Sequence, residues 1–207
     1  AHKGISMMTI QLEGASGHSS DPSLGANALD AMHRVMGELI AMREELAAAN
    51  QNNAFAVNVP TMNLGCMRAG DNPNRICGHA ALQIDLRLLP GMDSEAIHEA
   101  LERRIAAVVA NTGVSLQLHK AYPPIPPFQS DPNGDLLGAL SGLSGNQPGT
   151  VAFGTEAHFM QTLGMETVVW GPGSIDQAHQ PNEYLDKAQL APATDTLRRV
   201  IQKFCLV

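Results

Sequence analysis

Residues 60–89 read PTMNLGCMRAGDNPNRICGHAALQIDLRLL, two runs of apolar residues separated by a polar segment. Apolar and polar residues alternate through its second part, Ile76–Leu89, and Pro60–Gly70 carries a similar run, so both are expected to be strands. Between them lies AGDNPNR, which is rich in Gly, Pro, Asn and Asp, the residues that form turns. The stretch therefore predicts two neighbouring strands joined by a turn.

The segments on either side extend this pattern to a complete α/β (α+β) unit. Ile5–Glu13 is expected to be a strand, and Asn27 to cap a long amphipathic helix that runs to about Ala49. Residues 91–113 have an Asp/Ser start, a helical apolar stripe and a Gly stop, and Val114–Ala121 alternates as a last strand. The order βαββαβ is typical of the ferredoxin-like fold.

A Pro-rich segment, YPPIPPFQSDPNG, follows and marks a domain boundary. We therefore expect one domain over residues 1–121 and a second over 122–207. The second domain is expected to contain short helices, a C-terminal helix and apolar strand-like runs, at 135–143, 151–153, 156–163, 167–170 and 193–204. This set is too small for a finished doubly wound domain and resembles the second half of one.

Composition excludes several classes of function. The net charge of −7 gives no electrostatic footprint for nucleic acid or for an anionic membrane. No apolar run approaches the roughly 20 residues of a membrane helix, and the first residues lack the apolar stretch of a signal peptide. The three cysteines are odd in number and widely spaced, so they predict neither a disulfide framework nor a zinc knuckle. These properties indicate a cytoplasmic protein with reduced thiols.

Two histidines are candidates for chemistry. His179 follows an apolar run and a Gly/Pro-rich loop, in VVWGPGSIDQAHQPNEYL. It is either a loop histidine that makes one backbone hydrogen bond or a metal ligand with Asn182 and Glu183 beside it. A catalytic zinc needs about three protein ligands, so His179 alone cannot hold one. His18, in ASGHSSDP, is either a bystander among turn-forming residues, which its spacing favours, or a donor to a developing oxyanion.

Two further sets could bind an anion. Arg87 ends an alternating strand, where its guanidinium could clamp a carboxylate or remain a solvated charge near Asp85. Asn74 lies in the turn that precedes this strand. Gly154 and Thr155 follow a short apolar run, where they could bind an anion at a helix start or act as a simple N-cap.

Five strings span nearly the whole chain in one order. Taken together they resemble the zinc-dependent amidohydrolase and peptidase family that includes acetylornithine deacetylase, succinyl-diaminopimelate desuccinylase and aminoacylase. The strings are GASGHSSDPSLGANAL (14–29), PTMNLGCMRAGDNPNRICGHAALQIDLRLLPGM (60–92), YPPIPP (122–127), FGTEAHFMQTLG (153–164) and VVWGPGSIDQAHQPNEYL (168–185). The resemblance implies a ferredoxin-like dimerisation lid over 1–121, followed by the C-terminal part of an α/β zinc-hydrolase catalytic domain.

The resemblance also implies a role for each candidate residue. His179 matches the family's C-terminal zinc ligand, and His18 matches the lid histidine that reaches across a dimer to the scissile carbonyl of the partner's substrate. Asn74 and Arg87 match positions that contact the carboxylate end of the substrate. Gly154 and Thr155, taken together, match a substrate-contacting turn near the metals.

The implied reaction is metal-dependent hydrolysis of N2-acetyl-L-ornithine to ornithine and acetate, a step of arginine biosynthesis. It uses two zincs per complete subunit, for which cobalt is a substitute, and a homodimer formed through the lid. The substrate is a small N-acyl amino acid, with no nucleic acid or membrane partner. The family's remaining metal ligands, a His-x-Asp, a bridging Asp and a Glu-Glu pair, lie upstream of the lid. Since none occurs here, we expect this chain to be a fragment that is metal-free and inactive by itself.

Two alternatives stay open. The acyl or amino-acid preference could be that of an acetylcitrulline deacetylase, a desuccinylase or an aminoacylase. The chain could also be a non-catalytic dimerisation module that keeps the lid without the metal-binding half.

Overall fold

The computed structural model describes residues 1–206 and divides the chain into two compact units. Unit 1 comprises residues 1–128 and 150–155, and unit 2 comprises residues 129–149 and the chain from Glu156 onward. The chain thus leaves unit 1 after Phe128, within the Pro-rich segment, and returns to it for one short stretch. The roles assigned to the two domains from the sequence stay predictions.

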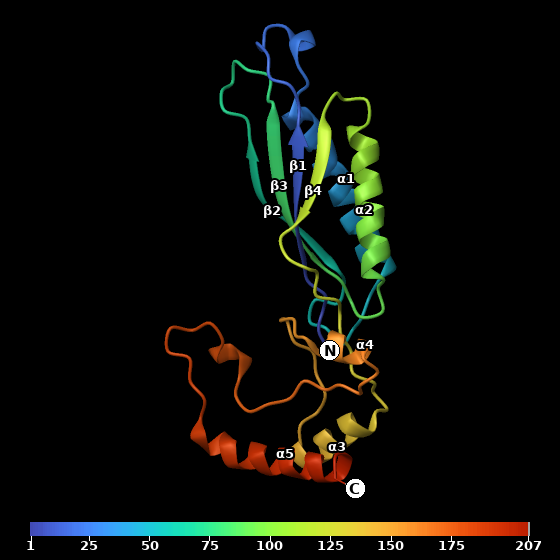
Figure 1. Cartoon of the computed structure of the whole chain (residues 1–207), viewed down its shortest axis with the longest axis vertical. Helices are drawn as coiled ribbons and strands as arrows, with labels where there is room; N and C mark the ends of the chain where they lie inside the picture. The colour runs from blue at the N-terminus through green and yellow to red at the C-terminus, as the bar shows by residue number, and fades with distance from the viewer. Residues whose placement is uncertain (207) are drawn as a thin grey trace. The chain divides into compact units, whose positions relative to one another are not determined.

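Unit 1 is a four-stranded antiparallel sheet with two long helices (Figure 1). The strands lie in the order β2-β3-β1-β4, and the chain order βαββαβ expected from the sequence is confirmed. The elements are β1 (Ser6–Glu13), 3-10 helix η1 (Pro22–Leu24), α1 (Ala28–Ala49), β2 (Thr61–Ala69), β3 (His79–Arg87), α2 (Ser94–Val109) and β4 (Ser115–Lys120).

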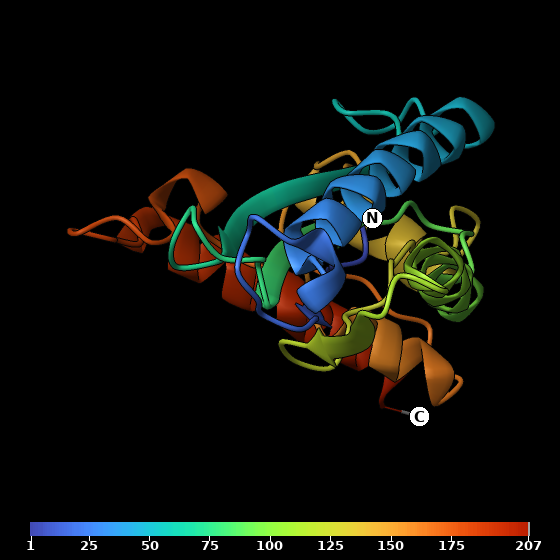
Figure 2. The same ribbon diagram turned by 90° about the horizontal axis from the view of Figure 1, so that it is seen from above.

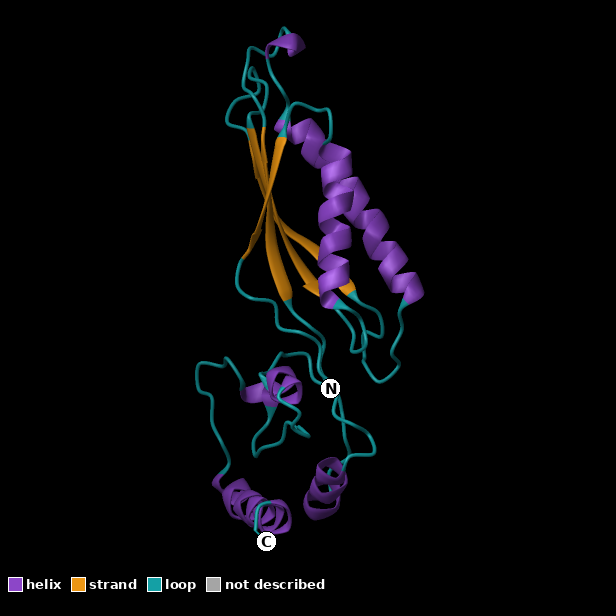
Figure 3. Ribbon diagram, turned by 45° about the vertical axis from the view of Figure 1, so that its right-hand side comes forward, coloured by secondary structure: helices purple, strands orange, loops and turns teal. Residues whose placement is uncertain are grey.

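The side-chain pattern of β3 explains why the two helices cover one face of the sheet. Ala80, Leu82 and Ile84 are buried, whereas the residues between them point to the other face. Both α1 and α2 lie on the buried side (Figure 3). The core between these layers is formed chiefly by Met8, Ile10, Leu12, Met32, Val35, Leu39, Leu82, Ile84, Leu86, Leu101 and Ile105.

Both helices begin at side-chain caps that the sequence marks. Oδ1 of Asn27 accepts hydrogen bonds from the first turn of α1, and Asp93 does the same for α2. The capped ends fix where each helix starts relative to the strand before it. No helix within residues 1–206 is long and apolar enough to cross a membrane.

Unit 2 is built from helices and loops. Its elements are α3 (Asp135–Ser144), α4 (Ala157–Thr162), 3-10 helices η2 (Ile175–Gln177) and η3 (Lys187–Gln189), and α5 (Leu190–Phe204). The backbone N–H of Leu136 donates to Oε1 of Glu166 at 2.8 Å, which fastens the start of α3 to the loop after α4.

The strands expected at 151–153 and 167–170 do not form. Residues 167–170 have no strand pairing, and Val151 makes an isolated bridge to His2 within unit 1. A strand requires a neighbour for its N–H and C=O groups, and the described chain supplies none beside residues 167–170. The apolar run is therefore present without the secondary structure that its composition favours.

Candidate functional site

The segment that carries His18, residues 14–26, is closed at its base by a tight backbone pair. The N–H of Ala15 donates to the carbonyl of Ala26 at 3.0 Å, and the N–H of Ala26 donates back at 2.9 Å. A Cβ atom at Gly14 would lie 2.0 Å from the carbonyl oxygen of Ala26, so glycine is required there. The closed base holds the two arms of the segment together at the end of β1.

Hydrogen bonds within the segment fix the tautomer of His18. The backbone N–H of Ser20 donates to Nδ1 at 3.2 Å, and the hydroxyl of Ser20 lies 2.7 Å from the same atom. Because Nδ1 accepts, the proton of the neutral imidazole lies on Nε2. His18 is exposed, and Nε2 makes no hydrogen bond to residues 1–206. The structure thus leaves an outward N–H donor at this position.

Asn74 lies beside the same segment. The N–H of Ser19 donates to the carbonyl of Asn74 at 3.0 Å, and His18 forms an isolated antiparallel bridge with Arg75. The side chain of Asn74 is exposed. Figure 2 looks onto this end of unit 1, with residues 14–26 (blue) and the turn between β2 and β3 next to each other. The structure therefore brings His18 and Asn74, two predicted site residues, to one end of the sheet.

Arg87 lies at the opposite end of the same sheet. In the β1–β3 register, Glu13 faces His79 near the His18 segment, whereas Ser6 faces Leu86 next to Arg87. A strand rises by about 3.3 Å per residue, so the two ends of β3 are roughly 25 Å apart. A single small amino acid derivative cannot contact both ends of one subunit.

The guanidinium of Arg87 is paired with Asp85 through Nε alone. Its Nε lies 3.0 Å from both carboxylate oxygens of Asp85. Within residues 1–206 its two terminal nitrogens donate no hydrogen bond. Both side chains are about a quarter exposed, at 26% and 28%. Both alternatives given for Arg87 from the sequence are thus compatible with the structure. Nε forms an ion pair with Asp85, and the two terminal nitrogens keep N–H donors for a carboxylate.

Gly154 and Thr155 lie at the Arg87 end of unit 1. The N–H of Gly4 donates to the carbonyl of Leu88 at 2.8 Å, which places the residues before β1 beside the strand end that carries Arg87. Two positions before Gly4, the ring of His2 contacts Thr155, with Nε2 3.1 Å from Oγ1. The structure therefore gathers Arg87, Gly154 and Thr155 at one end.

Close packing explains the glycine at 154. A Cβ atom there would lie 2.8 Å from Cδ1 of Ile5 and 3.4 Å from Cγ2 of Ile125. The backbone of this turn is thus pressed against the strand entry, and any side chain would push it away. The contact of Gly154 with substrate, which the resemblance implies, stays a prediction.

Sequence reasoning missed Lys3, a second cation at this end. Its Nζ donates to the carbonyl of Val59 at 2.6 Å. Burial lowers the pKa of Lys3, and the positive charge of Arg87 lowers it further. The two cations are thus close enough to interact, which favours anion binding here. No motif marks Lys3, because its neighbours in space come from β3 and from the loop before β2.

His179 lies in unit 2, in the loop after η2. It is exposed and has a φ of 63°, in the left-handed region that residues other than glycine seldom adopt. The preceding turn is fixed by the N–H of Ala178, which donates to the carbonyl of Ile175 at 3.0 Å. Among residues 1–206, no three His, Cys, Asp or Glu side chains are grouped to hold a metal ion. His179 is thus a single exposed imidazole on an unusual backbone.

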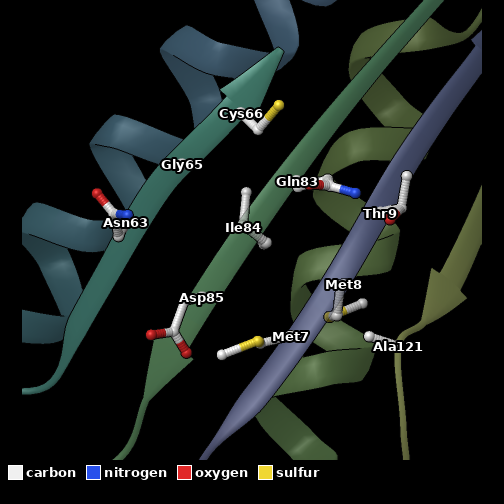
Figure 4. A pocket seen from close by; sticks show the side chains of 10 residues that line it. All are labelled: Met7, Met8, Thr9, Asn63, Gly65, Cys66, Gln83, Ile84, Asp85 and Ala121. Atoms are coloured by element: carbon white, nitrogen blue, oxygen red, sulfur yellow. The ribbon is translucent and has the colours of Figure 1, made fainter. Parts of the chain in front are cut away.

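The uncovered face of the sheet contains a shallow hollow of about 370 Å³ (Figure 4). Polar side chains from β2 and β3 line it, among them Asn63, Gln83 and Asp85, together with Met7 and Cys66. The sequence predicts none of these as a site residue, and it marks Asp85 only as a neighbour of Arg87. Asp85, which lines the hollow, also forms the ion pair with Arg87.

The family described as the peptidase dimerisation domain matches residues 1–112, which is more than half of the chain and lies within unit 1. The acetylornithine deacetylase of Pectobacterium atrosepticum is 41% identical over 205 residues, which cover 99% of this chain and 53% of the relative. That of Edwardsiella ictaluri is 40% identical over the same lengths.

The chain spans about half the length of the curated relatives it matches. Among solved structures, a tripeptidase from Staphylococcus aureus superposes with a TM-score of 0.66 at 16% identity, covering 98% of this chain and 52% of the tripeptidase. At that identity the likeness concerns the fold alone.

Proposed function

This chain belongs to the family of the peptidase dimerisation domain, and from that premise we propose that it is part of a metal-dependent amidohydrolase that deacetylates N2-acetyl-L-ornithine. The observation that carries the proposal is the 41% identity to an acetylornithine deacetylase over 205 residues, because it extends through both units. In this proposal unit 1 is the dimerisation lid, and unit 2 is the C-terminal portion of the catalytic domain.

The placement of the candidate residues supports a site shared by two subunits. His18 and Asn74 lie at one end of the sheet and Arg87 at the other, so one substrate cannot contact both sets in the same subunit. A two-fold related copy that runs antiparallel brings the His18 end of one subunit toward the Arg87 end of its partner. The proposed partner is therefore a second copy of this chain.

Each residue then has a definite task in amide hydrolysis. His18 donates its Nε2–H to the carbonyl oxygen of the substrate as negative charge develops there. Arg87 and Asn74 hold the α-carboxylate, so that binding energy positions the amide for attack. Thr155 and the backbone of Gly154 form a polar turn against the substrate. The released products are acetate and the free amino acid.

The proposed metal is zinc, with cobalt as a substitute, and its centre cannot be formed by this chain alone. Zinc sites in hydrolases take about three protein ligands, whereas the described residues offer His179 without two further ligands beside it. His179 is proposed to supply one ligand to a centre completed by residues outside this chain. Its left-handed backbone supports a functional role, since such conformations cluster at binding sites. A bound metal would supply an activated water.

Two other functions remain to be separated by experiment. A relative with another acyl or amino-acid preference would use the same residues, because the carboxylate and the amide are common to all N-acyl amino acids. A dimerisation module without catalysis would keep the edge of the sheet and would not need the His18 tautomer or the free nitrogens of Arg87. Those two features favour catalysis.

The test is an assay of the whole gene product beside the 207-residue chain. N-acetylornithine, N-acetylcitrulline, N-succinyl-diaminopimelate and an N-acetylated neutral amino acid are offered with added zinc or cobalt. We expect turnover of N-acetylornithine by the longer protein, none by the 207-residue chain, and a cytoplasmic location in cell fractionation. Preference for another substrate would reassign the specificity. Absence of hydrolysis and of bound metal in the longer protein would overturn the proposal.

A further inference from the structure

His2 is the most deeply buried histidine of the described chain, with 1% of its surface exposed. Its backbone lies between two segments that are distant in sequence. It exchanges hydrogen bonds with Phe128 at 2.8 and 3.0 Å on one side and forms a parallel bridge with Val151 on the other. Its ring packs against the ring of Phe128, with centroids 5.5 Å apart. The imidazole is therefore held in one position.

The hydrogen bonds of the ring define which nitrogen carries the proton. Nδ1 lies 2.9 Å from the carbonyl oxygen of Lys3, which can only accept, so Nδ1 is the donor. Nε2 then presents a lone pair, and the backbone N–H of Thr155 donates to it at 3.2 Å. The hydroxyl of Thr155 lies 3.1 Å from the same nitrogen. His2 thus contacts both the main chain and the side chain of Thr155.

This contact links positions 153 residues apart, and both ends of it lie in unit 1. Gly154, the neighbour of Thr155, is pressed against Ile5, so the turn has little freedom to move toward the strand entry. Nε2 of His2, a buried acceptor for the N–H of Thr155, holds the turn at a second point. Losing that acceptor would leave the N–H of Thr155 without this partner and allow the turn to shift.

We propose that His2 is a positioning residue, which acts through its neutral imidazole to hold Thr155 in the orientation that contacts substrate. This inference rests on the proposed function for its consequence in catalysis, whereas the contact itself can be tested without any substrate. His2 does not touch the substrate in this proposal. It belongs to the layer of hydrogen bonds behind the binding residue.

The catalytic test compares His2→Leu with His2→Gln in the full-length enzyme. Leucine has a similar size and no acceptor, whereas the amide oxygen of glutamine can reach the position of Nε2. We expect His2→Leu to lower kcat/KM for N-acetylornithine by about tenfold, the effect of losing one buried hydrogen bond, and His2→Gln to recover most of it. The same change at the exposed His119, His119→Leu, serves as the control and should leave kcat/KM unchanged.

A double-mutant cycle separates positioning from general stability. If His2 acts through Thr155, adding His2→Leu to Thr155→Ala should change kcat/KM by less than about twofold. An equal loss in both backgrounds would overturn the proposal, as would a glutamine variant as impaired as the leucine variant. Either result would make His2 a residue of the core alone.

Hydrogen exchange in the 207-residue chain provides the readout that does not depend on activity. The amide of Thr155 should exchange faster in His2→Leu than in the unmodified chain, and His2→Gln should restore its protection. If the amide of Thr155 exchanged at the same rate in His2→Leu as in the unmodified chain, the proposed contact between His2 and Thr155 would be overturned, whatever the activity assays show. If the full-length protein hydrolyses none of the N-acyl amino acids, the proposed function fails while the exchange result still decides whether His2 holds Thr155.

Discussion

The backbone N–H of Ser20 donates to Nδ1 of His18 at 3.2 Å, and this bond determines which nitrogen of the imidazole faces outward as a donor. The side-chain hydroxyl of Ser20 lies near the same atom, but the main-chain donor suffices to set the tautomer. A turn of three residues therefore prepares a donor for a carbonyl oxygen. The feature is local, whereas in the proposed function the carbonyl oxygen belongs to a substrate bound to the partner subunit.

Removing the His18 imidazole should slow the chemical step. In the full-length enzyme we expect His18→Ala to reduce kcat about a hundredfold with little change in KM, since an oxyanion donor acts chiefly in the transition state. Steady-state kinetics with N-acetylornithine measure both constants. His79→Ala removes an exposed histidine of the same sheet end and should retain full activity. A rise in KM with unchanged kcat would assign His18 to binding instead.

Replacing Arg87 by lysine should weaken recognition of the substrate carboxylate. Lysine keeps the charge but loses the planar fork, so we expect KM for N-acetylornithine to rise at least tenfold. The corresponding substrate with a carboxamide in place of the carboxylate should be hydrolysed equally slowly by both enzymes. Arg68→Lys, on β2, is the matched control and should behave as the unmodified enzyme. Equal KM values for the carboxylate in all three proteins would contradict the role.

The free edge of β2 is the expected dimer contact. β2 carries a bulge between Leu64 and Cys66, and Met67 beyond it is 39% exposed. Met67→Lys places a charge at that edge and should convert a dimer to a monomer in size-exclusion chromatography with light scattering. Gln117→Lys, on the opposite edge strand β4, should leave the dimer intact. If only Gln117→Lys dissociated the dimer, the contact would lie at the β4 edge instead of the β2 edge.

The free energy of unfolding should decrease as the pH is lowered, because a buried histidine of α2 resists protonation in the folded state. His98 is 6% exposed, and its Nε2 lies 2.9 Å from the hydroxyl of Ser6. Burial lowers the pKa of His98, the charge of Lys120 lowers it further, and Glu95 opposes them. The folded state thus binds the proton less tightly than the unfolded chain, in which histidine titrates near pH 6.5. The contribution of neutral His98 to the free energy of unfolding is complete above about pH 6.5. It is lost as the pH falls toward the lowered pKa of the folded state.

The measurement is the free energy of unfolding in urea between pH 7.5 and 5. His98→Gln keeps a hydrogen-bonding group and removes the titration, so its stability should decline less over this range than that of the unmodified chain. His119→Gln, at an exposed position, should follow the unmodified chain. Identical slopes for all three would show that His98 does not couple folding to pH.

A side chain at Gly14 should open the base of the His18 segment. Because its Cβ would lie 2.0 Å from a backbone oxygen, we expect Gly14→Ala to lower the free energy of unfolding by about 1–3 kcal/mol and to reduce kcat in the full-length enzyme. Gly142→Ala, within α3 where a Cβ meets no atom within 4 Å, should be neutral or stabilising. Urea unfolding of the 207-residue chain checks both, and an unaltered Gly14→Ala variant would contradict the close approach.

The fold of unit 1 could be predicted because its signals are local. The helix expected to start after Asn27 does start at Ala28, since the cap residue and the apolar spacing act on the same few turns. The strand expected over 76–89 was too long at its start, because residues 76–78 form backbone links to the His18 segment and to α1 instead of joining the ladder. Tertiary contacts therefore decide the ends of the elements.

The arrangement of the site could not be predicted in the same way. Alternation in β3 shows that Arg87 faces the uncovered side, but the distance between Arg87 and His18 depends on the pairing of β1 with β3. His2 gave no signal, since its partner Thr155 is far along the chain. The run at 167–170 reads as a strand from its composition, and it lacks a neighbour in the described chain. In each case the missing information is a contact between distant segments.

The return of residues 150–155 to unit 1 limits how that unit can be excised genetically. A shorter gene that stops at Phe128 would lose the N–H of Val151, which donates to the carbonyl of Ala1 at 3.0 Å, and would uncover one side of His2. Phe128 and Val151 flank His2 on opposite sides, so their backbones are about 10 Å apart, twice the spacing of neighbouring strands. A short flexible linker from Phe128 to Thr150 can bridge that gap. A gene for unit 1 alone must therefore join two separate stretches of the chain, residues 1–128 and 150–155.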